Sequence, residues 1–220
     1  MMRFAITFAA AFSLSAPTMA AEPVAGRSSE DVAIQAMHFY AACIVNQTPQ
    51  GAREALALDS ASPEYHKKLI RIAEGHKDQC VGGNNMRFND VLLAGALAER
   101  LLQLYDAPPR FVPMIASAKP IPAHDAMEVM AICVTHAVPE KVWALFATDP
   151  TSQDEIAALN AMSPTIVGCI KSGQKIALNK PGLRAALAIS AYRLGHEDVK
   201  DSTNVSAGST TMDMPQNACP

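Results

Sequence analysis

The sequence predicts an all-α protein built from two tandem copies of a four-helix repeat. We expect each copy to be closed by its own disulfide bond and the copies to be related by an approximate two-fold axis. Aromatic residues make up 5% of the chain and apolar residues 50%, a composition that favours helices over strands. Apolar residues recur at helical spacing, and cysteines recur in the same register about ninety positions apart.

The first twenty residues have the layout of a secretory signal peptide. Residues 1–3 form a short basic start, residues 4–14 are almost wholly apolar, and residues 18–20 place small side chains where a signal peptidase cleaves. The apolar stretch is shorter than the roughly 20 residues that cross a bilayer. We therefore expect residues 1–20 to be removed and the mature protein to be periplasmic or secreted.

The repeat is indicated by uncommon residues that match across the two halves. The matching pairs are Cys43 and Cys133, Pro49 and Pro139, Asp59 and Asp149, Cys80 and Cys169, and Asn89 and Asn179. All lie ninety positions apart except the pair that begins with Cys80, which slips by one residue. We expect the first copy to occupy residues 21–106 and the second to occupy residues 125–197.

Capping residues predict four helices in the first copy. These helices are expected over residues 31–47, 49–57, 63–80 and from 90 onward. Thr48-Pro49 and Ser62-Pro63 each place a capping side chain before a proline, which is favoured at the first helical position. Gly82-Gly83 is typical of a helix C-terminus, and Asn89 is typical of an N-cap.

The second copy carries similar signals. Ser152 and Glu155 have the spacing of a capping box, and Asn179 is placed to cap the last helix. Ser163-Pro164 indicates either a restart or a kink.

Two segments lie outside the repeats. Residues 107–124 contain five prolines, which excludes a continuous helix. The segment also contains apolar residues, so we expect it to lie against one or both copies. The tail, residues 198–220, is polar and rich in Ser, Thr and Gly, and we expect it to be disordered.

Four of the five cysteines are expected to form structural disulfides, because export leads to an oxidising compartment. Four cysteines allow three pairings, and their spacing alone does not choose among them. A repeat that folds as a unit closes its own bridge, which favours Cys43–Cys80 and Cys133–Cys169. The alternative, a redox or metal role, lacks a Cys-x-x-Cys sequence.

Cys219 is left over near the end of the chain. We expect an unpaired thiol that becomes capped by a small thiol. The alternative is an intermolecular disulfide, which would make a covalent dimer or a tether to a partner.

No sequence pattern commits the chain to a reaction, a metal or a cofactor. A Gly-x-Ser-x-Gly elbow is absent, and the carboxylates of Asp154-Glu155 are explained by a predicted helix start. The histidines do not have the His-x-x-x-His spacing of a helical metal site; they are His38, His66, His76, His124, His136 and His196. A net charge of −3 argues against a nucleic-acid surface. We expect no metal, cofactor, nucleic acid or transmembrane segment.

The two copies share the pattern Cys-[Ile/Val], Pro, Asp, Cys-[Ile/Val] and a final Asn-x-x-x-Leu-x-x-Ala-Leu-Ala. This pattern resembles a set of small secreted α-helical proteins with paired-cysteine repeats from α-proteobacteria. The resemblance covers most of the mature chain and implies periplasmic placement. That set has no established activity, so the resemblance implies no mechanism.

The function we expect is non-enzymatic binding of a small ligand, a peptide or an envelope protein. The seam between the repeats, roofed by the proline-rich segment, is the expected groove. Tyr105, Phe111 and Trp143 are its candidate wall residues. The alternatives are a purely structural or stress-related envelope protein, and a hydrolase-type enzyme with an unrecognised site. Histidine and carboxylate groups that converge in the structure would indicate the enzyme.

Overall fold

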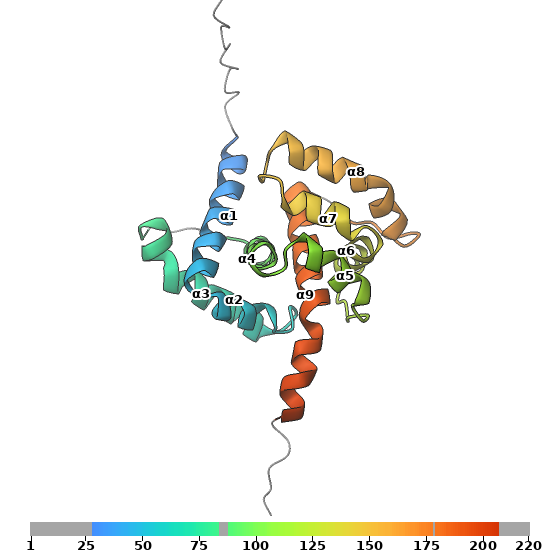
Figure 1. The fold of residues 1–220 in the computed structure, drawn as a ribbon. Helices are drawn as coiled ribbons and strands as arrows, with labels where there is room; N and C mark the ends of the chain where they lie inside the picture. The colour runs from blue at the N-terminus through green and yellow to red at the C-terminus, as the bar shows by residue number, and fades with distance from the viewer. Residues whose placement is uncertain (1–27, 84–87, 178, 207–220) are drawn as a thin grey trace, which may run out of the picture.

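The computed structural model describes residues 28–83, 88–177 and 179–206, which form nine helices and no strand (Figure 1). The helices are α1 (Ser29–Gln47), α2 (Pro49–Leu56), α3 (Pro63–Val81), α4 (Asp90–Tyr105), α5 (Pro108–Ser117), α6 (Ala126–Ala137), α7 (Pro139–Phe146), α8 (Gln153–Cys169) and α9 (Lys180–Ser206). The all-α prediction is confirmed. The expected signal peptide and Cys219 lie outside the described residues.

Several helix ends are set by the residues that the sequence indicates. Ser62 Oγ accepts a hydrogen bond from the Tyr65 backbone N–H at the start of α3, and Asn89 Oδ1 accepts one from Val91 at the start of α4. Gly82 ends α3 with a φ of 63°, in the left-handed region that glycine adopts without a steric cost.

Helix α8 differs from the expected pattern in two respects. Ser152 Oγ accepts from the Glu155 N–H, but the Glu155 carboxylate accepts from the Thr151 N–H, so the expected reciprocal capping box is incomplete. The helix also continues through Pro164 to Cys169 without a restart. The other oxygen of the Glu155 carboxylate accepts a hydrogen bond from the buried guanidinium of Arg184, which is described below.

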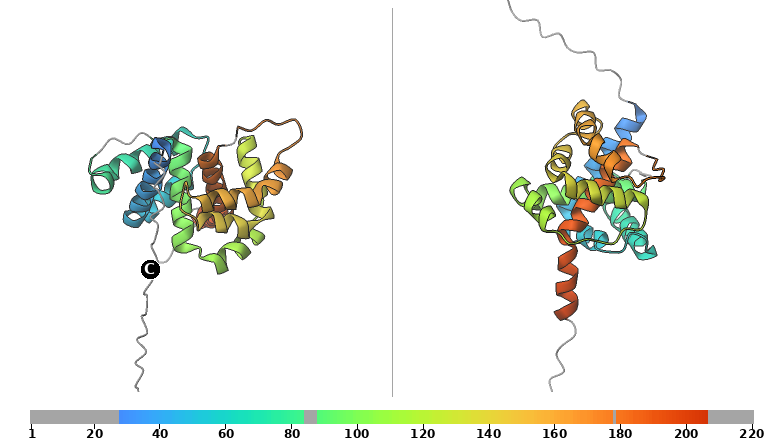
Figure 2. Two further views of the ribbon diagram at one scale, coloured as in Figure 1. Left: turned by 90° about the horizontal axis from the view of Figure 1, so that it is seen from above. Right: turned by 90° about the vertical axis from the view of Figure 1, so that its right-hand side faces the viewer.

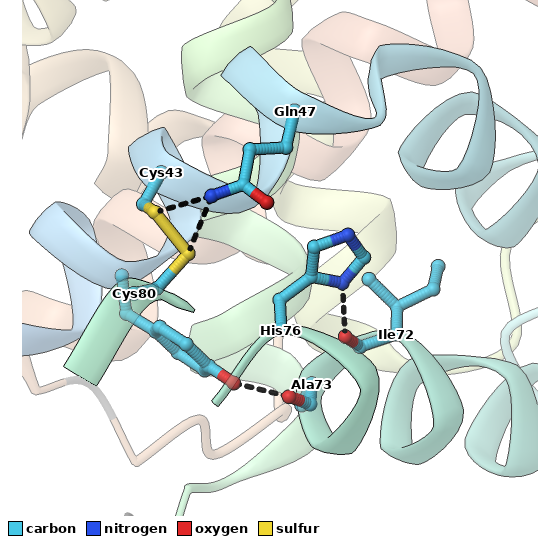
Figure 3. Close-up of a disulfide and its surroundings, with 7 residues drawn as sticks. Cys43, Gln47, Ile72, Ala73, His76 and Cys80 are labelled. Atoms are coloured by element: carbon cyan, nitrogen blue, oxygen red, sulfur yellow. Dashed lines mark hydrogen bonds between the residues drawn. A yellow bond between two sulfur atoms is a disulfide. The ribbon is translucent and has the colours of Figure 1, made fainter. Parts of the chain in front are cut away.

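One disulfide bond ties helix ends together in each half of the chain. Cys43 at the end of α1 is joined to Cys80 at the end of α3, with 5.8 Å between their Cα atoms. Cys133 near the end of α6 is joined to Cys169 at the end of α8, with a Cα separation of 5.7 Å. Figure 3 shows Gln47 beside the first bridge, where its Nε2 lies 3.3 Å and 3.5 Å from the two sulfur atoms. These pairs are the ones that the repeat favours.

The proline-rich segment contains a helix and packs against the second half. Pro108 and Pro109 occupy the first positions of α5, where a backbone N–H is not needed. Phe111 and Ile115 are fully buried as α5 packs on α6, α7 and α9. Helical structure stops at Ser117 and resumes at Ala126, so no continuous helix crosses the segment.

Residues 198–206, which we expected to belong to a disordered tail, continue α9 to Ser206. Extending an existing helix costs much less than nucleating one, so a polar sequence can prolong it. The right-hand view of Figure 2 shows these last turns leaving the body of the protein. Residues 207–220 lie outside the described part.

Helices α4 and α9 form the centre of the fold, and α1 and α6 pack against them. Their buried residues include Leu93 and Leu97 on α4 and Leu187 on α9. Among the described helices, none is long and apolar enough to cross a membrane by itself. Helices α6 and α7 meet that criterion only as a pair, and they are bent by 105° at their junction.

Candidate functional site

A groove of about 240 Å³ opens where α1, α4 and α9 begin. Its lining residues are Glu30 and Ile34 from α1, Asn89, Val91 and Leu92 from the start of α4, and Asn179, Pro181 and Gly182 from the start of α9. The groove lies at the contact between α4 in the first half and α9 in the second. We call its apolar lining residues the walls, and its exposed polar lining residues, Glu30, Asn89 and Asn179, the rim.

Two asparagines at the rim are fixed by capping hydrogen bonds. Asn89 Oδ1 accepts from the Val91 N–H at 2.9 Å, and Asn179 Oδ1 accepts from the Gly182 N–H at 2.7 Å. A Cβ on Gly182 would lie 2.7 Å from Asn179 Oδ1. Because Gly182 has no side chain, the Asn179 carboxamide has room to make this capping hydrogen bond.

A small hollow beside His38 lies next to the groove. The hollow measures about 10 Å³ and shares Ile34, Leu92 and Pro181 with the outer groove. This volume is about that needed for one water molecule. Burial, followed by the nearby Arg184 guanidinium, lowers the pKa of His38 to about 4, so its imidazole is neutral at pH 7.

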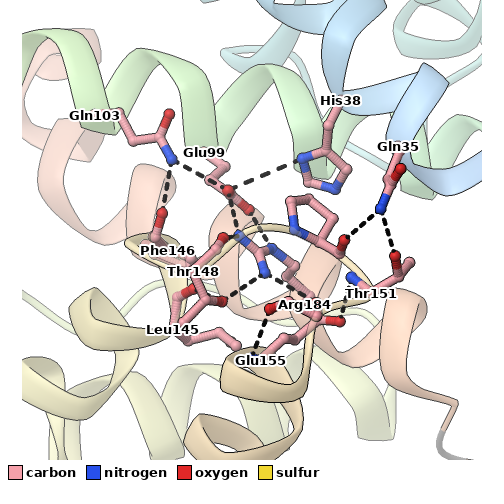
Figure 4. A network of polar contacts seen from close by, with 12 residues as sticks. Gln35, His38, Glu99, Gln103, Leu145, Phe146, Thr148, Thr151, Glu155 and Arg184 are labelled. Carbon is pink, nitrogen blue, oxygen red and sulfur yellow. Dashed lines mark hydrogen bonds and ion pairs between the residues drawn. The ribbon is translucent and has the colours of Figure 1, made fainter. Parts of the chain in front are cut away.

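Behind His38 lies a buried ionic network centred on Arg184, which is 1% exposed (Figure 4). Its Nε and Nη2 atoms donate to the carboxylate of Glu99 at 2.8 Å and 2.7 Å, and Nη1 donates to Glu155 Oε1 at 2.9 Å. Nη2 also donates to the Thr148 carbonyl at 2.8 Å. Burial raises the pKa of Glu99, while its hydrogen bonds from Arg184 act in the opposite direction.

The network ties the turn before α8 to α1. Gln35 Nε2 donates to Thr151 Oγ1 at 2.8 Å and to the Pro150 carbonyl at 3.3 Å. Thr151 has a φ of 68°, a conformation that costs energy for a β-branched residue. Its N–H donates to Glu155 Oε2 at 2.8 Å. Contacts from both halves therefore hold this turn in place.

Histidine and carboxylate groups do converge, as an enzyme would require, but most of their polar atoms contact other groups of the protein, and Asp106 Oδ2 is buried without a hydrogen-bond partner. Both carboxylates around Arg184 bind its guanidinium. A second pair joins His196 Nε2 to Asp106 Oδ2 at 3.4 Å, while His196 Nδ1 lies 2.9 Å from the Tyr192 carbonyl oxygen. Both ring nitrogens thus face acceptors inside the protein. This geometry favours a structural role for the pair over proton transfer to a substrate.

The three aromatic residues predicted as groove walls do not line this groove. Phe111 is fully buried, with its ring centroid 5.1 Å from that of Trp143 and 6.4 Å from that of Phe146. Tyr105 is 41% exposed and lies beneath Arg53, whose guanidinium carbon is 4.2 Å from the ring centroid. Residues of the proline-rich segment are likewise not among the lining residues.

The sequence predicted neither the groove residues nor the buried ions. Arg184 lies between Leu183 and Ala185 in an apolar helical stretch, and Glu99 lies in a similar stretch of α4. A charge on the apolar face of a predicted helix signals a buried partner elsewhere in the chain. Within the described ranges, no group of three or more His, Cys, Asp and Glu residues is placed to hold a metal ion.

No family model matches the chain, and neither the curated proteins nor the solved structures searched contain a match.

Proposed function

We propose that this chain is an exported, non-enzymatic binding module whose ligand occupies the groove at the start of α1, α4 and α9. The groove itself is the observation that carries the proposal, since it lies at the seam between the halves and is open to solvent. The ligand is a small molecule, or a short part of a peptide or envelope protein. The two disulfide bonds are compatible with an oxidising extracellular compartment.

The dimensions of the groove limit what it can hold. Its volume of about 240 Å³ lies below the roughly 300–1,000 Å³ typical of drug-sized ligands. Val91, on its wall, is 49% exposed, so apolar surface is available to a partner. The site therefore suits one or two apolar side chains, or a ligand of similar size.

We also propose that the two halves arose as copies of one helical unit. Helices α2 and α7 begin at Pro49 and Pro139, and α4 and α9 begin at Asp90 and Lys180, so both pairs of starts lie ninety positions apart. Two rigid halves that meet along α4 and α9 keep the groove in shape without a ligand. A preformed site of this kind reduces the entropic cost of binding.

A purely structural role is the second candidate, and the Arg184 network favours it. The network joins the halves through Arg184 and Glu99, and its charges are satisfied within the protein. A structural role requires no ligand in the groove, so an experiment that detects a bound ligand distinguishes it from the binding function.

The test is native mass spectrometry, without reductant, on protein exported and purified from its own host. Leu92→Trp fills the groove, and Val91→Trp is a second filling variant if the first does not fold. Val167→Trp is the matched control, because Val167 is 70% exposed on α8 and does not line the groove. Binding predicts a reproducible bound mass on wild type and on the control, which the filling variants lose. If the filling variants keep the bound mass, the ligand does not occupy the groove. If the wild-type chain carries no bound mass, the structural role is supported.

A further inference from the structure

We infer that the groove takes an uncharged apolar peptide segment, whose main-chain carbonyl groups accept hydrogen bonds from the carboxamides of Asn89 and Asn179. This inference rests on the binding function proposed above and names its ligand class. Three properties of the site carry it: two fixed donors at the rim, an almost balanced local charge, and an apolar wall.

The two asparagines supply donors that are already oriented. Each uses its Oδ1 atom to cap a helix, at 2.9 Å for Asn89 and 2.7 Å for Asn179. The capping bond fixes the carboxamide plane and leaves the Nδ2 group with two hydrogens to donate. Within the described part of the chain, no protein acceptor is bonded to either Nδ2 group. Both residues are exposed at the groove.

The charges around the rim favour a neutral ligand. Helices α1, α4 and α9 begin here, and each N-terminus contributes a partial positive charge of about half a unit. First-turn carboxylates on Glu30, Asp31 and Asp90 oppose these partial charges, and Lys180 adds one cation. Capping side chains also occupy N–H groups that an anion would use. An anionic head group would therefore meet the Glu30 carboxylate at the groove and find several of the helix N–H groups already bonded.

The walls favour an apolar side chain next to the acceptor groups. Ile34, Leu92 and Pro181 line both the outer groove and the inner hollow. The hollow ends at His38, the only lining residue there with a polar side chain. A sugar would leave most of its hydroxyl groups without partners on such a wall. A peptide places an apolar side chain and carbonyl oxygens within a few ångströms of each other, which matches the wall and the rim together.

The experiment is an NMR titration of the full exported chain, labelled with ¹⁵N, with three probes. The probes are the blocked peptide acetyl-Ala-Leu-Ala-amide, the anion octanoate and the neutral alcohol octanol. We expect the blocked peptide to shift the side-chain amide signals of Asn89 and Asn179 and the backbone signal of Leu92. We expect octanoate to bind more weakly than the peptide.

Serine variants isolate the donors, because serine also caps helices but lacks the carboxamide N–H groups. Asn89→Ser and Asn179→Ser should each weaken peptide binding by about fivefold, the effect of one neutral hydrogen bond, whereas octanol, whose single hydroxyl can meet only one carboxamide, should keep its affinity in at least one of the two variants. Asn160→Ser, at an exposed position of α8, is the control. If a serine variant loses its signal dispersion, Asn89→Asp replaces it, since aspartate caps equally well and removes the same donors.

The outcomes separate this inference from the proposed function. If octanoate shifts the groove signals and binds more tightly than the peptide, the peptide inference is overturned and the binding function stands. The same holds if the serine variants bind the peptide as wild type does. If none of the three probes shifts the signals of Ile34, Leu92 or the two asparagines, both the inference and the groove as a binding site are overturned.

Discussion

Gly95 of α4 lies directly against Ala185 of α9, and the two residues are ninety positions apart in the sequence. A Cβ atom built on Gly95 would lie 2.4 Å from both the Cα and the Cβ of Ala185. The absence of a side chain at Gly95 therefore allows the two central helices to approach closely. If the halves are copies of one unit, as proposed above, Gly95 and Ala185 are equivalent residues, and equivalent residues meet at a two-fold axis.

This contact predicts that Gly95→Ala destabilises the protein. The added methyl group meets backbone atoms of α9, so we expect the free energy of unfolding to fall by about 1–3 kcal/mol. Gly75→Ala on α3 is the control, because a Cβ there has no neighbour within 4 Å. It should raise stability by about 0.5–1 kcal/mol through helix propensity. Urea denaturation with the disulfides intact measures both; equal effects would contradict close packing of α4 on α9.

The Arg184 network predicts a large penalty when its cation alone is removed. Arg184→Met leaves Glu99 and Glu155 buried without their partner, and we expect a loss of about 3–5 kcal/mol. The triple variant Arg184→Met, Glu99→Gln, Glu155→Gln should recover a substantial part, because no uncompensated charge remains. Urea denaturation of the three proteins checks this, and a triple variant less stable than Arg184→Met would argue against the electrostatic explanation.

The lowered pKa of His38 predicts that acid reduces the stability of the folded protein. Its pKa falls from 6.5 to about 4 in the folded protein, with burial as the main cause and Arg184 second. Between these values the unfolded chain binds a proton that the folded chain does not. The free energy of unfolding therefore rises with pH from about 4 to 6.5, and the full difference is about 3 kcal/mol.

Substitution of His38 by glutamine should flatten that part of the pH profile. Denaturation of wild type and His38→Gln at pH 4.5 and pH 7 measures the difference, with His136→Gln as an exposed control on α6. The same pH dependence in wild type and His38→Gln would show that other groups carry the acid sensitivity.

The two disulfide bonds predict similar contributions to stability. Their sequence separations are 37 and 36 residues, and loops of this length correspond to about 4 kcal/mol each in the chain-entropy model. Replacing either pair by alanines should therefore lower the free energy of unfolding by comparable amounts. Thermal and urea unfolding of the two double variants test this, and a pair whose removal leaves stability unchanged would be inconsistent with it.

The local structure could be read from the sequence more fully than the site. Ser62, Gly82 and Asn89 marked helix ends because their capping bonds involve residues only a few positions away. The cysteine pairs followed from the assumption that each half closes its own bridge. Polar composition did not indicate the end of α9, where the helix continues to Ser206.

The groove could not be predicted because it is made by long-range packing. Ile34, Leu92 and Pro181 lie on three helices that are separate in sequence. Aromatic residues were predicted as the groove walls, but Phe111 of α5 and Trp143 of α7 pack against each other instead. The charge of Arg184 within an apolar stretch was the available signal for a buried network, although it did not identify Glu99 and Glu155 as its partners.

The most direct test of the binding proposal is a comparison of the native mass spectra of wild type and Leu92→Trp, both exported and purified from the same host without reductant. The proposal predicts a discrete bound mass on the wild-type chain that is lost or strongly reduced when Trp fills the groove. Identical spectra for the two proteins would contradict a ligand in the groove.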